Sequence, residues 1–348
     1  MKSIFFRKWK ARYLLMVVLI PFMLAINGCG RDFNVDLSNE SVESSDIRDE
    51  SLIVVGVSQL GSESVWRTAN TASLQRAFSK ENGYFMIFDN ARQKQENQMK
   101  AIRSFISQNV DYIVFSPIME EGWDSVLQEA KDAGIPVILM DRKVKVSDTS
   151  LYTAWVGSDF KEEGVKAGKW LEKFLESKGR LEDEVRIVVL QGTEGASSVL
   201  GRTEGFNEIL RKHENWKVLE CVNAEYTTAK AMEEMKRMLK KHERIDVVVS
   251  QNDDMTFGAV DAIRQEGLTP GIDGDIVLIS FDAVKAALQM VQDGVIGVDV
   301  ECNPDLGGYV RAIIEAIENG EPYEKHTYVE ERSFTKEMVG QYIEDRIY

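Results

Sequence analysis

The feature that most constrains the fold of this chain is a regular alternation, beginning at residue 52, of short apolar runs with amphipathic stretches. Short runs rich in β-branched residues, each followed by a helical pattern, are typical of parallel strands that are buried on both faces. The stretch 122–133 illustrates the helical pattern, because Val126, Leu127 and Ala130 place one apolar stripe on it. The expected strands are 52–57, 85–88, 112–115, 137–140, 154–156, 185–190, 217–222, 247–250, 276–281 and 297–301, and the expected helices include 95–108, 122–133, 161–177, 229–241 and 256–265.

The number of these runs predicts two sheets rather than one, each with five or six strands. The length of 348 residues also suits two lobes of about 120–150 residues each. Right-handed crossovers between parallel strands then give an α/β fold of two doubly wound parallel-sheet lobes. Since no linker rich in Gly or Pro separates the halves, we expect strands that cross directly between the lobes as a multi-strand hinge. The expected N-terminal lobe is 51–154 plus about 302–326, and the expected C-terminal lobe is 155–301 plus about 327–348.

The N-terminus carries an export pattern. Residues 1–28 hold five basic residues and no acid, and the apolar run 13–26 has the length of a signal-peptide core but is short for a membrane span. Small or apolar residues directly before Cys29 resemble a bacterial lipobox, in which the Cys is acylated and becomes the new N-terminus. We therefore expect a signal peptide at 1–28 and an acylated, flexible acidic tether at 29–50. The alternative is an uncleaved anchor helix with an incidental Cys.

Either interpretation places the body of the protein outside the cytoplasmic membrane, on the outer face of a Gram-positive cell or in the periplasm of a Gram-negative one. Removing the five basic residues from a net charge of −15 leaves −20. A body so acidic repels phosphate backbones, so we expect no nucleic-acid partner. A neutral ligand such as a sugar is indifferent to this field.

Catalytic and metal-binding patterns are weak in this sequence. His213, His242 and His326 do not follow a strand directly, and there is no Gly-x-Ser-x-Gly segment for a nucleophile. Cys221 and Cys302 are too far apart in sequence to indicate a disulfide framework or a metal site, and we expect each to pack as a small buried hydrophobe. Paired carboxylates leave glycoside hydrolysis open by composition, but Arg neighbours would keep them ionised. We expect neither an enzyme nor a bound cofactor or metal.

Binding-type side chains gather directly after the expected strands, where a cleft between two such lobes would lie. In the first such segment, 58–67, Ser62 or Ser64 can cap the helix that follows. Glu63 accepts hydrogen bonds from hydroxyls, Trp66 offers a flat apolar face and Arg67 offers a donor fork. The alternative is a capped helix with one exposed Trp.

Further candidates follow later strands. Asp141 and Arg142 can together accept from and donate to vicinal hydroxyls, or form a loop ion pair of little energetic consequence. Asn252 supplies both a donor and an acceptor, and we expect Asp254 to cap the next helix. The Asp-x-Asp-x-Asp-Gly pattern of a calcium loop is missing here. The remaining candidates are Tyr226, Asp282 and Glu301.

The glycines of the segment 191–197 suggest a phosphate loop, but their spacing fits neither G-x-G-x-x-G nor G-x-x-x-x-G-K-[ST]. A turn into a helix that presents Arg202 to the cleft is the simpler interpretation. Together the candidates supply acids, amides, guanidinium groups and aromatic faces, which is the composition of a site for a polyhydroxy compound.

Four segments carry a resemblance to a known family. The chain resembles the periplasmic sugar-binding proteins of the ribose-binding type, whose fold is the type I periplasmic binding protein fold shared with the ligand domain of lactose-repressor-like regulators. Within that group it is most similar to the galactofuranose-binding component of an ABC importer. The resemblance covers roughly residues 52–325, with Ala283 as a departure from the usual Asp-Gly. The segments are 56–64 with Trp66 and Arg67, 93–98, 190–193 with 195–197, and 252–255.

The resemblance implies a monomeric, lipid-anchored binding protein that closes by a hinge on a monosaccharide and delivers it to a membrane permease. The sugar would be galactofuranose-like, or another pentose or hexose. Two alternatives stay open at this point: a sugar sensor that reports to a chemoreceptor or histidine kinase, and a secreted carbohydrate-active enzyme. The resemblance also implies the roles of the ligand-binding residues, which are Ser62, Glu63, Trp66, Arg67, Asp141, Arg142, Arg202, Tyr226, Asn252, Asp282 and Glu301.

Overall fold

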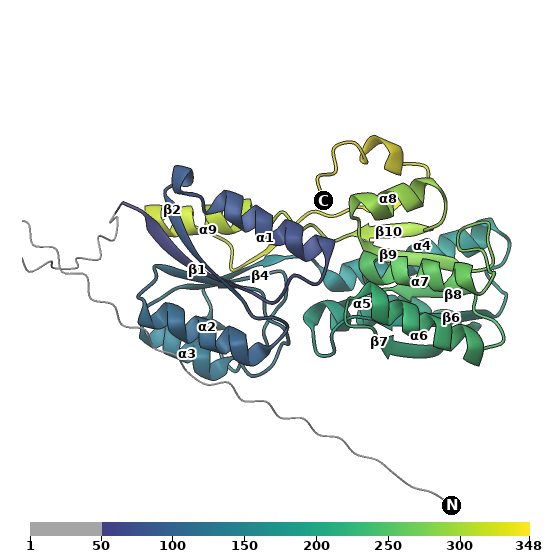
Figure 1. Cartoon of the computed structure of the whole chain (residues 1–348), viewed down its shortest axis with the longest axis horizontal. Helices are drawn as coiled ribbons and strands as arrows, with labels where there is room; N and C mark the ends of the chain where they lie inside the picture. The colour runs from purple at the N-terminus through teal and green to yellow at the C-terminus, as the bar shows by residue number, and fades with distance from the viewer. Residues whose placement is uncertain (1–50) are drawn as a thin grey trace, which may run out of the picture. The chain divides into compact units, whose positions relative to one another are not determined.

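The computed structural model describes residues 51–348. The expected signal peptide (1–28), the acylated Cys29 and the tether (29–50) lie outside the described residues. Within the described part, no helix combines the length and the apolar character that a membrane span requires. Two six-stranded sheets, each covered by helices, organise this part of the chain (Figure 1).

The first sheet has the strand order β11-β5-β4-β3-β1-β2, and all its pairings are parallel. Helices α1 and α9 pack on one face, and α2 and α3 pack on the other. These elements form the first lobe. Its strands are β1 (Ile53–Gln59), β2 (Tyr84–Asn90), β3 (Tyr112–Phe115), β4 (Val137–Met140), β5 (Ala154–Gly157) and β11 (His326–Tyr328), and its helices are α1 (Val65–Ala77), α2 (Gln95–Ser107), α3 (Asp124–Asp132) and α9 (Gly307–Asn319).

The second sheet has the order β12-β10-β9-β8-β6-β7, in which only the short β12 runs antiparallel to its neighbour among the described strands. These strands and α4 to α8 form the second lobe. Its strands are β6 (Val185–Gln191), β7 (Trp216–Asn223), β8 (Val247–Ser250), β9 (Val277–Asp282), β10 (Val298–Glu301) and β12 (Ser333–Thr335), and its helices are α4 (Phe160–Ser177), α5 (Ser197–Leu210), α6 (Thr228–Lys241), α7 (Asp253–Gln265) and α8 (Lys285–Gln292). Three short 3₁₀ turns complete the description: Lys80–Asn82, Thr149–Leu151 and Val339–Gln341.

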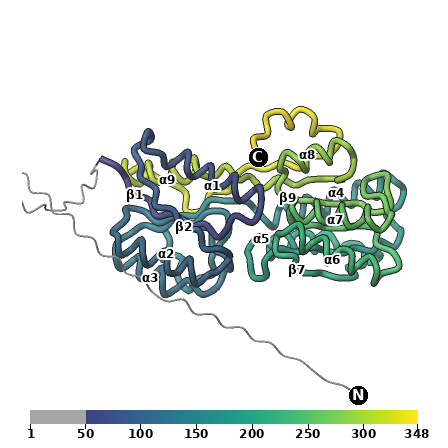
Figure 2. The backbone as a smooth tube through the Cα atoms, in the orientation of Figure 1, coloured from purple at the N-terminus to yellow at the C-terminus, as the bar shows by residue number. Residues whose placement is uncertain are grey.

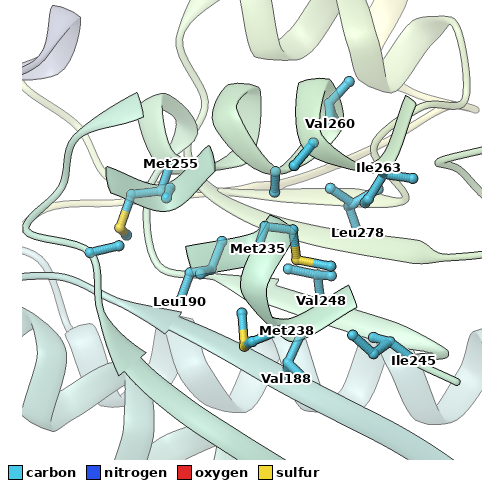
Figure 3. Packing of buried hydrophobic residues seen from close by; sticks show 14 of the residues in the cluster. Val188, Leu190, Met235, Met238, Ile245, Val248, Met255, Val260, Ile263 and Leu278 are labelled. Atoms are coloured by element: carbon cyan, nitrogen blue, oxygen red, sulfur yellow. The ribbon is translucent and has the colours of Figure 1, made fainter. Parts of the chain in front are cut away.

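Buried aliphatic side chains hold each sheet to its helices. Under α6 and α7, for example, Leu190 and Val248 from the sheet meet Met235 and Met255 from the helices in one cluster (Figure 3). Complete burial of these side chains is the main favourable contribution to folding, at roughly 1.5–3 kcal/mol for each. The runs are apolar on both sides because helices cover both faces of the sheet.

The chain passes between the lobes three times. It leaves the first sheet after Gly157, returns after Glu301, and leaves again after Tyr328. The segment after the third crossing lies over α8, where Phe334, Val339 and the end of the chain pack on this helix (Figure 2). These three crossings form the hinge of the molecule.

The predicted fold class is confirmed: two doubly wound lobes with alternating strands and helices. The ten predicted runs correspond to β1 through β10. Strands β11 and β12 were not predicted, because each has three residues and no apolar run. The prediction that Cys221 is buried is wrong, since it is exposed on β7. That strand is the edge of the sheet, and only Trp216 among its residues is buried.

Candidate functional site

A cavity lies where the C-terminal ends of strands from both lobes meet. It encloses about 310 Å³ of space free of protein atoms, including the part open to solvent. We call it the interlobe cavity. It is lined by Glu63, Ser64, Trp66, Arg67, Asp141 and Arg142 from the first lobe, by Phe160, Ser198, Arg202, Tyr226, Asn252 and Asp282 from the second, and by Cys302 of the second crossing.

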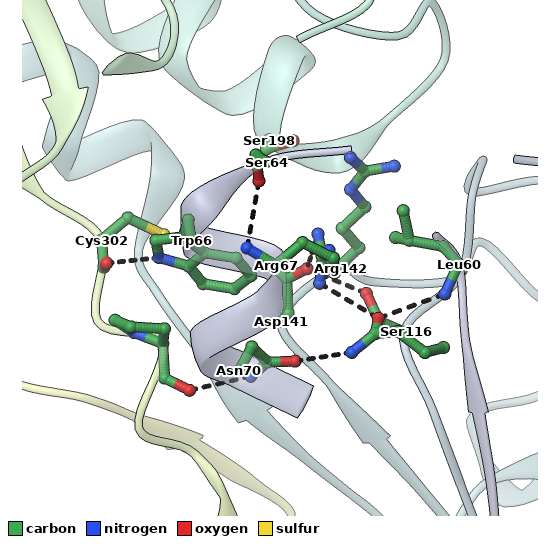
Figure 4. Close-up of polar contacts among 12 residues, drawn as sticks. Leu60, Ser64, Trp66, Arg67, Asn70, Ser116, Asp141, Arg142, Ser198 and Cys302 are labelled. Atoms are coloured by element: carbon green, nitrogen blue, oxygen red, sulfur yellow. Dashed lines mark hydrogen bonds and ion pairs between the residues drawn. The ribbon is translucent and has the colours of Figure 1, made fainter. Parts of the chain in front are cut away.

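The N-terminus of α1 positions the first group of these residues (Figure 4). Ser64 caps the helix, because its hydroxyl accepts the backbone N–H of Arg67 at 3.0 Å. This cap places Trp66 and Arg67 in the first turn, beside the cavity. The indole Nε1 of Trp66 donates to the Cys302 carbonyl at 2.6 Å. The Arg67 guanidinium lies 4.6 Å from the centre of the Trp66 ring.

Arg67 joins two carboxylates of the first lobe. Its guanidinium contacts Asp141 Oδ2 at 2.8 Å and Glu63 Oε1 at 3.3 Å, and all three side chains are largely buried. Burial alone would lower the pKa of Arg67, but Asp141 and Glu63 together raise it. Glu63 Oε2 is buried and has no hydrogen-bond partner. The charges of this group therefore stay paired, while one carboxylate oxygen of the lining residue Glu63 remains without a donor.

An aromatic residue and an arginine face each other across the cavity. The Arg142 guanidinium of the first lobe lies 5.3 Å from the centre of the Tyr226 ring of the second. Arg142 also donates to the Ile118 carbonyl at 3.0 Å, and the Tyr226 hydroxyl hydrogen-bonds to Ser198 at 2.7 Å. Tyr226 adopts a φ of 59°, so its ring position depends on a backbone conformation that few bulky residues adopt.

Arg202 of α5 is the most completely paired cation in the cavity. Its Nε contacts Glu163 Oε2 at 2.6 Å, Nη1 donates to the Gln251 carbonyl, and Nη2 lies 3.4 Å from Asp282 Oδ1. Phe160 and Phe281 flank the guanidinium at 5.5 and 4.9 Å. Burial would lower the pKa of Arg202, but Glu163 and the other acids around it raise it well above its usual range. The guanidinium is thus a fixed, permanently charged donor.

The loop after β9 holds Asp282 in a strained conformation. Asp282 and Ala283 have φ values of 110° and 60°, in the region that normally favours glycine. Two buried carboxylates secure this loop: Asp299 accepts the N–H of Ala283 at 3.1 Å, and Asp253 accepts the N–H of Val284 at 2.8 Å. Burial raises the pKa of Asp253 well above its usual range and that of Asp299 to about 7, so the pair retains a proton.

The prediction that Asp254 caps α7 is wrong. The cap is Asn252, whose side-chain oxygen accepts the N–H of Met255 at 2.9 Å. This bond uses the amide oxygen, so the amide N–H groups of Asn252 are the part of the side chain that remains for a ligand. The helix therefore begins at Asp253, three residues before the expected start at 256.

Two hydrogen bonds join the lobes directly beside the cavity. The backbone N–H of Lys143 donates to Ser197 Oγ at 2.9 Å, and that of Glu120 donates to the Gly195 carbonyl at 3.1 Å. Arg142, which precedes Lys143, and Ser198, which follows Ser197, both line the cavity. The lobe-to-lobe bonds therefore form next to candidate ligand residues on each side.

Most of the side chains predicted for the site line this cavity, and two do not. Ser62 is exposed before the helix cap. Glu301 is buried, but it accepts the N–H of Arg332 at 3.0 Å and pairs with Arg346 at 2.7 Å, so it holds the C-terminal segment. The residues along the cavity that were predicted are Glu63, Trp66, Arg67, Asp141, Arg142, Arg202, Tyr226, Asn252 and Asp282.

The sequence did not indicate Phe160, Ser198 or Cys302 as lining residues. Ser198 lies one turn before Arg202 on α5, a spacing that could have indicated it once Arg202 was chosen. Phe160 and Cys302 each stand just after a strand but look like ordinary apolar residues there. The three histidines lie away from the cavity and pair with Glu172, Glu220 and Tyr152.

Comparison with known proteins identifies the class of protein that this fold and site define. Residues 54–316 match the model of the periplasmic binding protein domain, and the chain belongs to this family. The galactofuranose-binding protein YtfQ of Escherichia coli (strain K12) is 39% identical over 259 residues, which are 74% of this chain and 79% of that protein. This chain is accordingly a binding protein and not an enzyme.

Two solved structures are similar throughout the described part of the chain. A protein from Mycobacterium smegmatis in complex with β-D-fucofuranose is 40% identical, with a TM-score of 0.80, over 84% of this chain and 95% of that chain. The binding protein of the arabinose ABC transporter from Shewanella sp. ANA-3, bound to α- and β-L-arabinofuranose, is 40% identical, with a TM-score of 0.78 and the same coverage.

Proposed function

We propose that this protein is the lipid-anchored solute-binding component of an ABC sugar importer, and that it binds one monosaccharide in its furanose form in the interlobe cavity. The observation that carries this proposal is the lining itself. Residues from both lobes supply charged hydrogen-bonding groups and three aromatic side chains around one small volume. A sugar in this cavity can form hydrogen bonds to both lobes only when the lobes are close together, so it stabilises the closed arrangement.

The balance of charge around the cavity favours a neutral ligand. Three guanidinium groups and three carboxyl groups line it, those of Arg67, Arg142 and Arg202 and those of Glu63, Asp141 and Asp282. Because the formal charges of these groups balance, an anionic or cationic ligand would add an uncompensated charge to a buried site, at a cost of several kcal/mol. Sugar hydroxyls, which both donate and accept, satisfy both kinds of group.

The furanose form is supported by the names of similar proteins. One binds galactofuranose by name, and the two solved structures hold fucofuranose and arabinofuranose. The five-membered ring is compact, which suits a cavity of about 310 Å³.

A thermal-shift panel tests the proposal. We expect L-arabinose, D-fucose or D-galactose to raise the melting temperature, because a ligand that binds only the folded protein stabilises it by about 2.7 kcal/mol at one hundred times its dissociation constant. Sucrose and myo-inositol, which cannot supply a free monosaccharide furanose, are expected to give no shift. If none of the pentoses or hexoses shifts the transition, the protein is not a monosaccharide-binding protein.

The lipid anchor is tested separately. Cys29→Ser is expected to release the protein from the membrane into the medium or the soluble periplasmic fraction, because stable anchoring requires the acyl chains. Fractionation and immunoblotting measure the distribution. Cys221→Ser is the matched control, since that thiol is exposed on the folded body and its loss should leave the distribution unchanged. A Cys29→Ser protein that stays in the membrane fraction would indicate an uncleaved anchor helix instead.

A further inference from the structure

All three chain crossings of the hinge meet at one carboxyl group. Glu331 lies in the third crossing, between β11 and β12. Its Oε1 accepts the hydroxyl of Ser158 in the first crossing at 2.5 Å, and the backbone N–H of Asn303 in the second crossing at 2.8 Å. A single side chain therefore joins the three segments about which the lobes would move.

The same carboxyl group lies beside the anchor of Arg202. Glu163 of α4 is fully buried; its Oε2 holds Arg202 at 2.6 Å, while its Oε1 is buried without a hydrogen-bond donor. Ligand-type atoms of Glu163, Glu331 and Cys302 all lie within 4.8 Å of one another. Two carboxylates this close in a buried place cannot both be ionised without a large cost.

We propose that Glu331 retains a proton at neutral pH and donates it to Glu163 Oε1, so that Glu331 is a positioning residue that fixes Arg202 for the ligand. The effect on ligand binding rests on the proposed function, whereas the shared proton between Glu331 and Glu163 does not depend on it. The proton satisfies the one oxygen of Glu163 that lacks a donor. It also links the hinge crossings through Glu163 to a guanidinium that lines the interlobe cavity.

The surrounding groups favour a proton over a metal ion at this position. Arg202 already contacts Glu163, and the Lys166 ammonium donates to the Glu331 carbonyl at 3.0 Å, so a cation would meet two positive charges. Asp282 faces the cluster from beyond Arg202. Burial, with Glu163 adding to it, raises the pKa of Glu331 to about 9, and burial raises that of the Cys302 thiol well above its usual range. Glu331 and Cys302 are therefore neutral acids rather than metal-ligating anions, and the charge of Glu163, the third member of the cluster, is already paired with Arg202.

The pH dependence of stability tests the proton directly, without any sugar. The folded state keeps the Glu331 proton up to about pH 9, whereas the unfolded chain releases it near its ordinary pKa of about 4.3. Between these values the folded state binds more protons, so this group makes stability fall as pH rises. Glu331→Gln keeps a donor and cannot ionise. Its melting temperature minus that of the wild type should grow by about 8 °C between pH 5 and pH 9.

Two further variants complete this test. Glu330→Gln is the matched control, because Glu330 is exposed and adjacent in sequence, and its difference from the wild type should not change with pH. Zn²⁺ or EDTA should leave the wild-type melting temperature unchanged. The proposal is overturned if Glu331→Gln follows the wild-type pH profile, or if Zn²⁺ stabilises the wild type and Cys302→Ser removes that effect.

Sugar affinity tests the positioning role. With the best sugar of the panel at pH 7, Glu331→Gln should bind within about twofold of the wild type, whereas Glu331→Ala should bind at least tenfold more weakly. Equal affinities for the Ala variant and the wild type would contradict the role. If the wild type binds no sugar at all, the proposed function fails, and the pH profiles still decide whether the proton is there.

Discussion

Replacement of Arg202 by alanine is expected to weaken sugar binding more than tenfold and to destabilise the fold by about 3–5 kcal/mol. The binding effect follows from the loss of a charged donor in the interlobe cavity. The loss of stability follows because Glu163 has no exposure to solvent and relies on Arg202 as its charge partner. Truncation of one member of a buried ion pair leaves the other charge uncompensated.

Calorimetric titration and urea unfolding measure the two effects of this substitution. Arg202→Lys should recover part of the stability, because it keeps the charge but cannot contact Glu163, the Gln251 carbonyl and Asp282 together. Arg211→Ala is the matched control: it lies at the exposed end of the same helix, and both measurements should stay near wild-type values. Unchanged sugar affinity in Arg202→Ala would place the ligand elsewhere.

Gly192→Ala is expected to disable the site through the ring of Tyr226. A Cβ at this position would lie 1.9 Å from Cζ of Tyr226, so the ring would have to move. Displacement would break its hydrogen bond to Ser198 and its contact with Arg142. We expect at least a tenfold loss of sugar affinity, together with about 1–3 kcal/mol of lost stability from overpacking.

A double variant and a control isolate this cause. In Gly192→Ala with Tyr226→Ala the clash is gone, so the added methyl group should cost less than about 0.5 kcal/mol of stability relative to Tyr226→Ala alone. Gly308→Ala meets no atom within 4 Å on an exposed face of α9, and should be neutral or stabilising by about 1 kcal/mol. Full sugar affinity in Gly192→Ala would show that Tyr226 is not a ligand residue.

The strands of both sheets were predictable because burial on two faces leaves a strong sequence pattern. Val137–Met140 is apolar along its whole length and Val247–Ser250 is apolar up to its last residue, and neither a loop nor a surface helix produces such a run. The position of Arg202 was predictable for a related reason. A turn rich in glycine after a buried strand, followed by a helix, presents the first turns of that helix to the end of the sheet.

Contacts between distant segments were not predictable from the sequence. Gly192 was interpreted only as part of a turn. In the structure, the ring of Tyr226, 34 residues away, fills the space that a side chain at Gly192 would need. Cys302 and Glu331 carry no local pattern, because their partners belong to three separate crossings. Glu301 was misplaced in the site since its partner, Arg346, lies in a C-terminal segment with no periodicity.

A crystal structure with the best sugar of the panel tests the central claim most directly. The account predicts a single sugar ring within the interlobe cavity, hydrogen-bonded to Arg67 or Asp141 of the first lobe and to Arg202 or Asn252 of the second, with the two lobes in contact beside it. A sugar bound outside this cavity, or held by one lobe alone, would contradict the account.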